Sequence, residues 1–249
     1  MSVRASDLRV RLGGFALGPV DLALRPGAIT ALVGPNGGGK TTLLRALAGL
    51  LAPSRGSVEI DGASVASLSS SVRARRIAFV PQRPAVPPGL LVRELVALGR
   101  LRVGVDAGSV DRAMAAVGVA GLADRTMPSL SAGQVHRAAV ARALCQCGDA
   151  TRLLVLDEPT STLDPAWSRE LARLARQVAD RGVAVVVATH DLGFVGACAD
   201  DAVLVADGRV VAAGAWCVTA TVDALGRLFG TPFAEAHGLA ARALPLPRW

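Results

Sequence analysis

The chain has 249 residues, of which 51% are hydrophobic and 19% are charged. A chain this apolar buries a full core, which excludes intrinsic disorder, and its length fits one large domain or two small ones. The net charge of +7 keeps nucleic acid, anionic lipid and phosphate ligands as candidate partners.

Short apolar segments recur along the chain and predict the strands of a buried sheet. Runs this apolar are typical of strands covered on both faces. They span residues 29–33, 77–80, 153–156, 183–188, 203–205 and 210–212. Segments with helical periodicity lie between them, including residues 42–51 and 171–178. This alternation predicts an α/β fold with a mostly parallel sheet, while Asp61-Gly62 and Asp207-Gly208 predict hairpin turns.

Residues 83–149 differ from the segments on either side. The segment opens with several prolines, contains no strand-like run, and has helical apolar spacing over residues 91–101 and 110–117. We therefore expect a helical insertion, and the Ala-, Pro- and Arg-rich tail predicts a short helical appendage. The predicted organisation is a single domain over residues 1–249, with a core at 1–82 and 150–215, the insertion at 83–149 and the appendage at 216–249.

A glycine-rich segment follows the first of these runs. Residues 34–41, GPNGGGKT, match the pattern G-x-x-x-x-G-K-[ST] between a predicted strand and a predicted helix, which is the context this phosphate-binding loop requires. Lys40 is the only lysine in the chain. It would reach the β- and γ-phosphates of a nucleotide, and the Thr41 hydroxyl would bind Mg²⁺. The predicted nucleotide contacts are Gly34, Pro35, Asn36, Gly37, Gly38, Gly39, Lys40, Thr41 and Thr42.

Polar side chains follow three other predicted strands. Asp157 and Glu158 come after the run at residues 153–156, His190 follows the run at 183–188, and Gln82 follows the run at 77–80. Ligands bind at the carboxyl ends of parallel strands, so we expect one shared site. Asp157 is placed to hold Mg²⁺ through water, and Glu158 to orient or deprotonate an attacking water. A histidine alone is more often structural, but the shared edge favours a role in the site.

The sequence also allows a prediction of the cellular compartment. The longest apolar runs are far shorter than the roughly 18 residues that a membrane span needs, and the start of the chain has no apolar signal-peptide region. We expect a cytosolic protein that can sit on a membrane protein. The four cysteines have no metal-ligand spacing with the histidines, and we expect small buried hydrophobic residues in a reducing compartment. They are Cys145, Cys147, Cys198 and Cys217.

Residues 130–134, LSAGQ, resemble the signature sequence of ABC-type ATPases. The resemblance extends over nearly the whole chain. It comprises a Walker A loop at 34–41, a Q-loop at Gln82, the signature at 130–134, a Walker B segment at 153–158, a D-loop at 161–164 and an H-loop at His190. Ser131 and Gln134 also match a capping box, which predicts a helix that begins there and runs toward Leu144.

The resemblance implies a P-loop NTPase core with an antiparallel β subdomain and an inserted α-helical subdomain. It also implies ATP and Mg²⁺ as cofactors and a homodimer that sandwiches two nucleotides, each closed by the other copy's signature. The implied catalytic residues are Glu158, His190 and Gln82. The implied metal site is Thr41, Gln82 and Asp157, and further nucleotide contacts are Ser131, Ala132, Gly133, Gln134 and Asp164.

The chain departs from this family at several positions. Ala132 replaces the usual glycine of the signature, and His136 stands where the family often has glutamine. The chain contains no tyrosine, and the position of the usual adenine-stacking aromatic falls near Arg11 or Leu12, with Phe15 close by. Base recognition is therefore less defined than phosphate binding.

Residues 92–100, VRELVALGR, resemble the ATPase subunits of importers for iron-siderophores, haem and cobalamin, as does the tail at 218–230, although residues 101–103 depart from that group. The resemblance implies two permease subunits, docked on residues 83–102, and indirectly an extracytoplasmic substrate-binding protein. It also implies a peripheral position on the cytoplasmic face of the inner membrane. Alternatively, residues 92–100 form an ordinary amphipathic helix that packs on the core.

Other functions stay open. A zinc or manganese importer is the nearest alternative within transporters. A non-transport ABC ATPase acting on ribosomes or DNA usually carries a second ATPase domain or a long coiled coil, so we expect no nucleic-acid partner. Glu158 and His190 disfavour a module that binds nucleotide without turnover. Copurification with a permease separates transport from the other roles, and metal-dependent growth of a deletion strain separates the cargoes.

Overall fold

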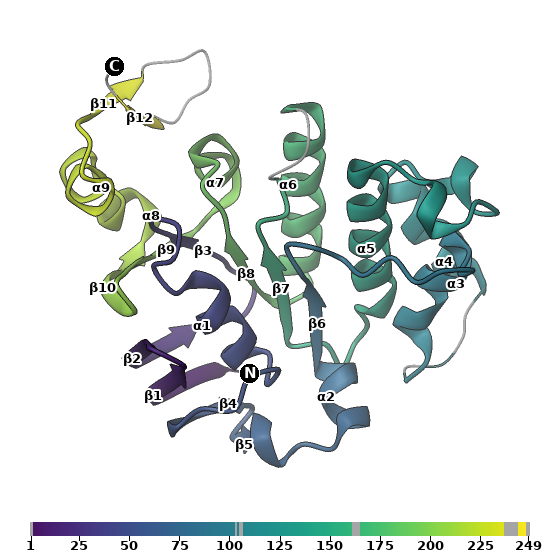
Figure 1. Cartoon of the computed structure of the whole chain (residues 1–249), viewed down its shortest axis with the longest axis horizontal. Helices are drawn as coiled ribbons and strands as arrows, with labels where there is room; N and C mark the ends of the chain where they lie inside the picture. The colour runs from purple at the N-terminus through teal and green to yellow at the C-terminus, as the bar shows by residue number, and fades with distance from the viewer. Residues whose placement is uncertain (1, 103, 105–106, 161–164, 237–243, 248–249) are drawn as a thin grey trace.

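The computed structural model describes residues 2–102, 104, 107–160, 165–236 and 244–247. Its centre is a six-stranded sheet in the order β10-β9-β3-β8-β7-β6 (Figure 1). Neighbours from β9 to β6 are parallel, and β10 is antiparallel to β9, so the predicted mostly parallel sheet is confirmed. The strands are β3 Ile29–Val33, β6 Ile77–Val80, β7 Leu153–Asp157, β8 Ala184–Ala188, β9 Asp201–Ala206 and β10 Arg209–Ala215.

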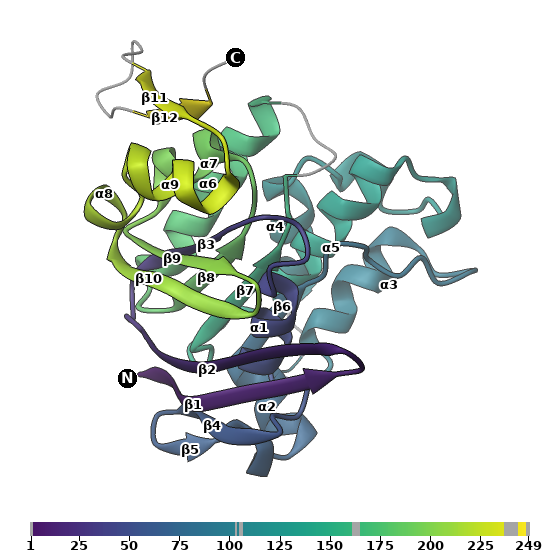
Figure 2. The ribbon, with the colours of Figure 1, turned by 60° about the vertical axis from the view of Figure 1, so that its left-hand side comes forward.

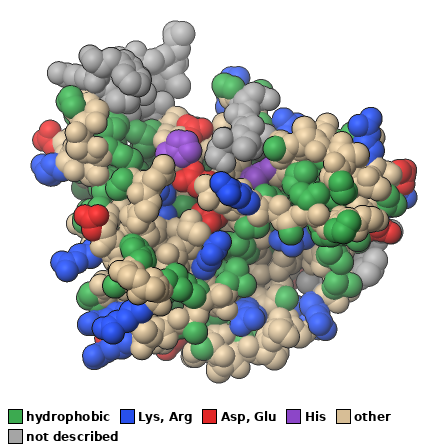
Figure 3. Space-filling model, viewed as in Figure 1, with side chains coloured by type: hydrophobic (Ala, Val, Ile, Leu, Met, Phe, Trp, Pro, Cys, Tyr) green, Lys and Arg blue, Asp and Glu red, His purple; other side chains and the backbone are tan. Residues whose placement is uncertain are grey.

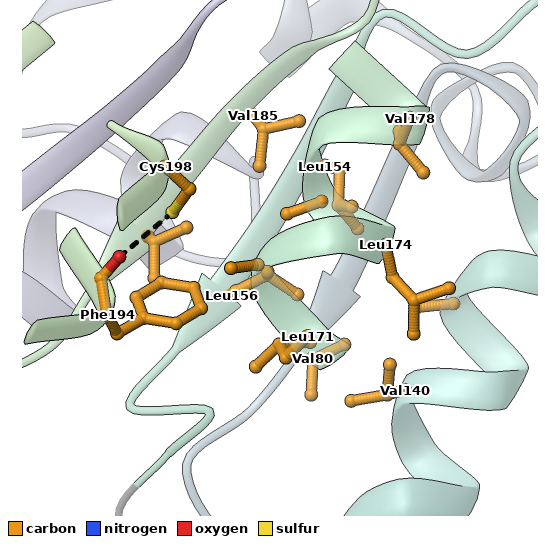
Figure 4. Packing of buried hydrophobic residues seen from close by; sticks show 14 of the residues in the cluster. Val80, Val140, Leu154, Leu156, Leu171, Leu174, Val178, Val185, Phe194 and Cys198 are labelled. Carbon is orange, nitrogen blue, oxygen red and sulfur yellow. Dashed lines mark hydrogen bonds between the residues drawn. The ribbon is translucent and has the colours of Figure 1, made fainter. Parts of the chain in front are cut away.

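Helices cover both faces of this sheet, which is why its strands are apolar at successive positions. On one face, helix α6 (Pro165–Ala179) places an apolar stripe that includes Leu171 and Leu174 against Leu154 and Leu156 of β7 (Figure 4). Helix α7 (Leu192–Cys198) shares that face. The intervening β7 side chains pack in a second cluster with helix α1 (Lys40–Leu47). Burial of each leucine side chain contributes about 1.5–3 kcal/mol to the stability of the fold. This packing on both faces holds the strand ends in fixed positions.

A second, antiparallel sheet lies on the far side of α1 (Figures 1 and 2). Its order is β2-β1-β4-β5, from β1 Val3–Leu12, β2 Phe15–Leu24, β4 Arg55–Ile60 and β5 Ala63–Ser64. It corresponds to the expected antiparallel subdomain. Runs of apolar residues did not reveal β1 and β2, because a strand with one face in solvent alternates apolar and polar residues.

Both predicted hairpin turns are confirmed. Asp61-Gly62 joins β4 to β5, and Asp207-Gly208 joins β9 to β10. All four residues have positive φ, between 47° and 77°, as the hairpin turn favoured by Asp-Gly requires. Helix α1 ends earlier than predicted, at Leu47 rather than at residue 51, because Gly49 turns the backbone to a φ of 66° and ends the helical hydrogen bonding.

The described part of the predicted insertion is helical. Beyond a single bridge between Leu91 and Thr126, it contains helices and turns and no strand. Helix α3 packs on α4 and α5, and α5 also contacts β6, so the insertion lies beside the edge of the central sheet (Figure 1). The helices are α3 Val92–Ala97, α4 Ala107–Ala116 and α5 Ala132–Gln146, with short 3₁₀ turns η2 Leu98–Arg100, η3 Ala120–Leu122 and η4 Met127–Ser129; η1 Val65–Ser67 and α2 Ser70–Arg76 precede β6.

The tail corrects the expectation of a helical appendage. Helices α8 (Trp216–Thr219) and α9 (Val222–Phe229) are present, but β11 (Phe233–Ala236) and β12 (Leu244–Pro247) then form an antiparallel pair beside α9 (Figure 2). The two strands are consecutive in the chain, and the composition of the tail alone did not show that they pair. Among the described residues, no helix has the length and apolar character needed to cross a bilayer.

The cysteines also differ from expectation. Cys145 and Cys198 are buried, but Cys147 is only half-buried and Cys217 is exposed. Cys217 lies in the short helix α8, whose buried residue is Trp216. The prediction that every cysteine is buried was therefore wrong for Cys217.

Candidate functional site

The carboxyl ends of β3, β6, β7 and β8 meet at one edge of the central sheet, where the structure contains a cavity of about 550 Å³. On this face of the molecule, acidic and histidine side chains lie close to lysine or arginine side chains (Figure 3). The cavity unites residues from the glycine-rich loop, two further strand ends and the turn between β1 and β2. Its lining is Leu12, Phe15, Asn36, Gly37, Gly39, Lys40, Thr41, Thr42, Gln82 and Glu158.

Two glycines show why the loop needs its composition. A Cβ on Gly34 would lie 1.9 Å from the Val205 carbonyl oxygen, so only glycine allows β9 to approach this closely. Gly39 has a φ of 109° and is the N-cap of α1, where no side chain caps the helix. The first N–H groups of α1 thus lack a side-chain acceptor, and such a helix start is a binding site for anions.

Lys40 begins α1 and is only 6% exposed. Its Nζ donates hydrogen bonds to the carbonyl oxygens of Gly34, at 2.8 Å, and Pro35, at 3.0 Å, and lies 4.0 Å from Oε1 of Glu158. Burial lowers the pKa of Lys40, while the carboxylates of Glu158 and Asp157 oppose that change. An ammonium held on the loop's own carbonyls can exchange them for phosphate oxygens without a large movement.

Asp157 and Thr41 form a second polar contact beside the loop. The Thr41 hydroxyl donates to Oδ1 of Asp157 at 3.0 Å. Asp157 is 1% exposed, and in the described part of the chain no donor reaches its buried Oδ2. Burial raises the pKa of Asp157, and the Thr41 hydrogen bond opposes this. A free carboxylate oxygen beside a hydroxyl is a hard donor set that suits Mg²⁺.

Side chains that could bind a metal ion are not clustered in the described part of the chain. The residues that the structure describes contain no cluster of three His, Cys, Asp or Glu side chains able to hold a metal ion. A dedicated protein cage is therefore not what this edge provides. Mg²⁺ usually binds through one or two protein oxygens together with waters and substrate phosphates, and Asp157 with Thr41 fits that pattern.

Glu158 and His190 come together from the ends of β7 and β8. Nδ1 of His190 lies 2.8 Å from Oε2 of Glu158, and the side chains are 61% and 7% exposed respectively. The Glu158 N–H donates to the Ala188 carbonyl oxygen at 2.8 Å, and its φ is 50°. That conformation costs a residue other than glycine about 1–3 kcal/mol, and it turns the carboxylate toward the cavity, which Glu158 lines.

Leu12 and Phe15 supply the apolar part of the cavity. They flank the turn between β1 and β2, and the Phe15 ring lies close to the loop, since a Cβ on Gly39 would be 3.1 Å from it. Arg11, the other candidate for the base-binding position, is not among the lining residues. The sequence places the base-binding position near Arg11 or Leu12, with Phe15 close by, and of these three residues Leu12 and Phe15 line the cavity.

The signature residues lie elsewhere. Ser131 Oγ accepts a hydrogen bond from the Gln134 N–H at 3.3 Å, and Gln134 Oε1 accepts one from the Ser131 N–H at 3.0 Å, so the predicted capping box is confirmed at the start of α5. Ser131 and Ala132 are exposed, and among the described residues the cavity lining contains no signature residue. Asp164 and the rest of the predicted D-loop, 161–164, lie outside the described residues.

His136 is buried and lies about one helical turn after the exposed start of α5. No hydrogen-bond partner for either ring nitrogen is found in the described part of the chain. Burial lowers the pKa of His136 to about 4, so the ring is neutral at physiological pH. The departure from glutamine at this position therefore replaces a polar amide with an uncharged ring inside the insertion, without adding charge near the signature.

A second hollow, of about 340 Å³, lies between the central sheet and the insertion. Arg142 of α5 lines it and donates from Nη2 to the Phe79 carbonyl oxygen at 3.0 Å, and burial lowers the pKa of Arg142. The hollow is lined by both apolar and polar side chains, including Arg73 and Arg142. Its lining is Ala48, Leu50, Ser70, Arg73, Ala74, Ile77, Phe79, Leu98, Gly99, Arg142 and Gln146.

Comparison with known sequences gives a consistent result. The family model for ABC transporters matches residues 17–161. The chain is 43% identical to the hemin import ATP-binding protein HmuV of Nocardia farcinica, over 99% of this chain and 89% of that protein. It is 42% identical to the cobalamin import ATP-binding protein BtuD of Halobacterium salinarum, over 99% of this chain but 64% of that protein.

Solved structures agree with these matches. A chain from a transporter described as metal-chelate type, in an inward-facing conformation, has a TM-score of 0.79 and 28% identity, over 100% of this chain and 97% of that chain. A dimeric ATP-binding cassette bound to ADP and phosphate has a TM-score of 0.76 and 24% identity, over 86% and 98% of the two chains. At that identity the second likeness concerns the fold alone.

Proposed function

The chain belongs to the ABC transporter family, and we propose that it is the ATP-binding and ATP-hydrolysing subunit of an importer for haem, cobalamin or an iron-siderophore. The observation that carries this proposal is the convergence of Lys40, Asp157, Glu158 and His190 around one edge of the sheet. Phosphate binding alone needs only the loop. A carboxylate and an imidazole beside it supply groups for hydrolysis.

Binding of ATP would use groups that are already in place. The Lys40 ammonium and the uncapped N–H groups of α1 neutralise the phosphates. Leu12 and Phe15 offer an apolar surface to the base. Thr41 and Asp157, with Gln82 from the lining of the cavity, would hold Mg²⁺. When bound, the ion supplies positive charge that offsets the charge on the phosphate oxygens.

Hydrolysis would then depend on Glu158. Its carboxylate orients a water for attack on the γ-phosphorus and accepts the proton as the bond to the ADP oxygen breaks. His190 holds the other side of this carboxylate through Nδ1, and its second ring nitrogen stays available for a contact to the γ-phosphate. Lys40 limits the charge repulsion between carboxylate and phosphate because it lies 4.0 Å from Glu158.

The signature points to a homodimer. Ser131 and Ala132 are exposed at the start of α5, and the described lining of the nucleotide cavity comes from other segments. A helix start that cannot serve its own site can close over a nucleotide held by a second copy. Ser131, Ala132, Gly133 and Gln134, together with Asp164, would make those contacts, so that two copies enclose two ATP molecules.

Docking on two permease subunits would use the hollow of about 340 Å³. It shares Leu98 and Gly99 with the predicted docking segment, 83–102, and extends it to α2, β6 and α5. A hollow between the core and the insertion that offers both apolar and polar side chains is suited to a short amphipathic helix from another protein. This would place the chain on the cytoplasmic face of the inner membrane, linked through the permease to an extracytoplasmic substrate-binding protein. The relatives named for hemin and cobalamin import support the cargo class.

The deciding experiment compares steady-state ATP hydrolysis by the wild type and Glu158→Gln, with oligomeric state followed with and without ATP. We expect the variant to lose turnover by at least about a hundredfold, the usual contribution of a general base, and to accumulate as an ATP-bound dimer. Glu170→Gln is the matched control, because Glu170 is an exposed partner of Arg173 on α6. Near-normal hydrolysis by Glu158→Gln would refute the assignment of the base.

Transport is tested separately. Copurification of the chain with a permease, lost on Leu98→Glu in the hollow but retained on exposed Val211→Glu, would support the importer. Turnover without any permease partner would instead favour a non-transport ATPase. Growth of a deletion strain on haem, cobalamin, an iron-siderophore, zinc or manganese would then separate the cargoes.

A further inference from the structure

The contact between Glu158 and His190 lies just beyond the last rung of the β7–β8 ladder. The register of the two strands ends at Asp157 opposite Ala188. Past that point, the hydroxyl oxygens of Thr160 and Thr189 lie 3.1 Å apart, and these residues are only 7% and 0% exposed. The two threonines therefore extend the link between the strands after the backbone ladder has ended.

The hydroxyl of Thr189 has a second contact. It accepts a hydrogen bond from the Asp191 N–H at 3.0 Å, in addition to its contact with Thr160. A threonine hydroxyl offers one proton and two lone pairs; in Thr189 the Asp191 N–H takes one lone pair, and the contact with Thr160 takes either the proton or the other lone pair. Loss of the Thr189 hydroxyl would remove the acceptor of the Asp191 N–H, and loss of the Thr160 hydroxyl would leave the buried Thr189 hydroxyl with one partner fewer; a lost partner in a buried site costs more than the hydrogen bond itself contributes.

Asp191 carries the link onward to the helices. Its Oδ1 accepts from the Phe194 N–H at 2.9 Å and caps α7, and its Oδ2 accepts from the Ser168 hydroxyl of α6 at 3.3 Å. The turn that contains His190 is thus fixed on both sides, by Thr189 before it and Asp191 after it. One series of hydrogen bonds joins the end of β7, the end of β8 and the start of α6.

We infer that Thr160 and Thr189 are positioning residues, which hold the backbone on either side of the catalytic pair so that the His190 imidazole stays against the Glu158 carboxylate. Thr160 lies two residues after Glu158, and Thr189 lies immediately before His190. The two contacts, hydroxyl to hydroxyl and imidazole to carboxylate, close a small ring. His190 is largely exposed, and this ring restricts the side-chain positions available to it. The inference rests on the proposed ATPase function.

The test compares variants that lack the hydroxyl group of each threonine with variants that keep it. Thr160→Val and Thr189→Val remove it, and Thr160→Ser and Thr189→Ser retain it. We expect each valine variant to lower kcat for ATP about tenfold, as the loss of one buried hydrogen bond would, and to change KM less than about twofold, since ground-state contacts to the nucleotide are kept. Each serine variant should restore most of the rate.

The same valine substitutions made in a His190→Ala variant separate a positioning role from a general effect on stability. In His190→Ala, the valine substitutions have no imidazole to hold, so we expect no further loss of kcat. An equal loss in both backgrounds, or wild-type kcat in both valine variants, would overturn the inference while leaving the ATPase intact. If Thr189→Val does not fold, Thr160→Val decides, because it keeps the contact from the Asp191 N–H to Thr189. A wild-type protein without turnover would overturn the proposed function, and this inference with it.

Discussion

Helices α1 and α5 both begin at a segment proposed to meet phosphate, yet they begin in opposite ways. The N-cap of α1 is Gly39, at a φ of 109° and with no side-chain cap. The N-cap of α5 is Ser131, which exchanges hydrogen bonds with Gln134 in a capping box. The start of α1 leaves its N–H groups available to a ligand. The start of α5 satisfies two backbone N–H groups, those of Ser131 and Gln134, with side chains of the same helix start.

Burial explains why α1 is stable without the side-chain cap that α5 has. Helix α1 lies between two sheets and buries Leu43, Leu44 and Leu47 completely, so packing holds it in place without a cap. The start of α5 is exposed and gains about 1 kcal/mol from its cap. The comparison fits the proposed dimer, in which the phosphate-binding loop of one copy would hold the nucleotide and the signature, a stable helix start, would meet the nucleotide of the second copy.

Among the variants that test the two helix starts, Lys40→Ala should have the largest effect. It removes the only charged donor at the start of α1, and we expect affinity for ATP to fall about 10- to 100-fold, in line with the loss of a charge-assisted hydrogen bond. Titration with a fluorescent ATP analogue measures this. Arg173→Ala, at an exposed ion pair on α6, is the control. Unchanged affinity would show that the N–H groups alone bind the phosphates.

Gly39→Ala tests whether the glycine N-cap is required. A Cβ at this position would lie 3.1 Å from both Leu17 and Phe15, at a φ that alanine rarely adopts. We expect the free energy of unfolding to fall by more than about 1 kcal/mol, with weaker ATP binding as the loop shifts. Urea denaturation and nucleotide titration measure the two effects. Gly62→Ala, which has a positive φ but open space around it, separates backbone strain from crowding.

Ser131→Ala removes the cap of α5. We expect the free energy of unfolding to fall by about 1 kcal/mol, while binding of ATP to an isolated copy is unchanged, because the signature lies outside its own cavity. Ser131→Asn should restore most of the stability, since asparagine is also a good N-cap. Loss of ATP binding by the monomeric protein would contradict the separation of the two helix starts.

Ala132→Gly should have the smallest effect. It lies in the first turn of α5, so we expect a stability loss of no more than about 0.5–1 kcal/mol, the cost of glycine in a helix. It also restores the usual residue of the signature. We expect a modest rise in turnover, measured under conditions in which the dimer forms. A fall in turnover would mean that Ala132 suits this chain's interface better.

Some features of the site could be predicted from the sequence because they are local. The glycine-rich loop depends on backbone conformations of single residues, and the capping box joins Ser131 to Gln134 across one helical turn. The Asp-Gly turns are local in the same sense. The strands of the central sheet were also accessible, since burial on both faces leaves continuous apolar runs.

Other features arise only when distant segments pack. Strand β8 lies between β3 and β7, and that order brings His190 to within 2.8 Å of Glu158. It also pairs Thr160 with Thr189 and leaves one oxygen of Asp157 open. The place of Phe15 at the loop is decided in the same way. The sequence by itself determined the loop and the caps, because backbone conformations and hydrogen bonds within a few residues suffice for them, and it determined the family through the order of its motifs. The tertiary structure decided which carboxylate, imidazole and hydroxyl meet, because those contacts depend on strand order and on the packing of both sheets against α1.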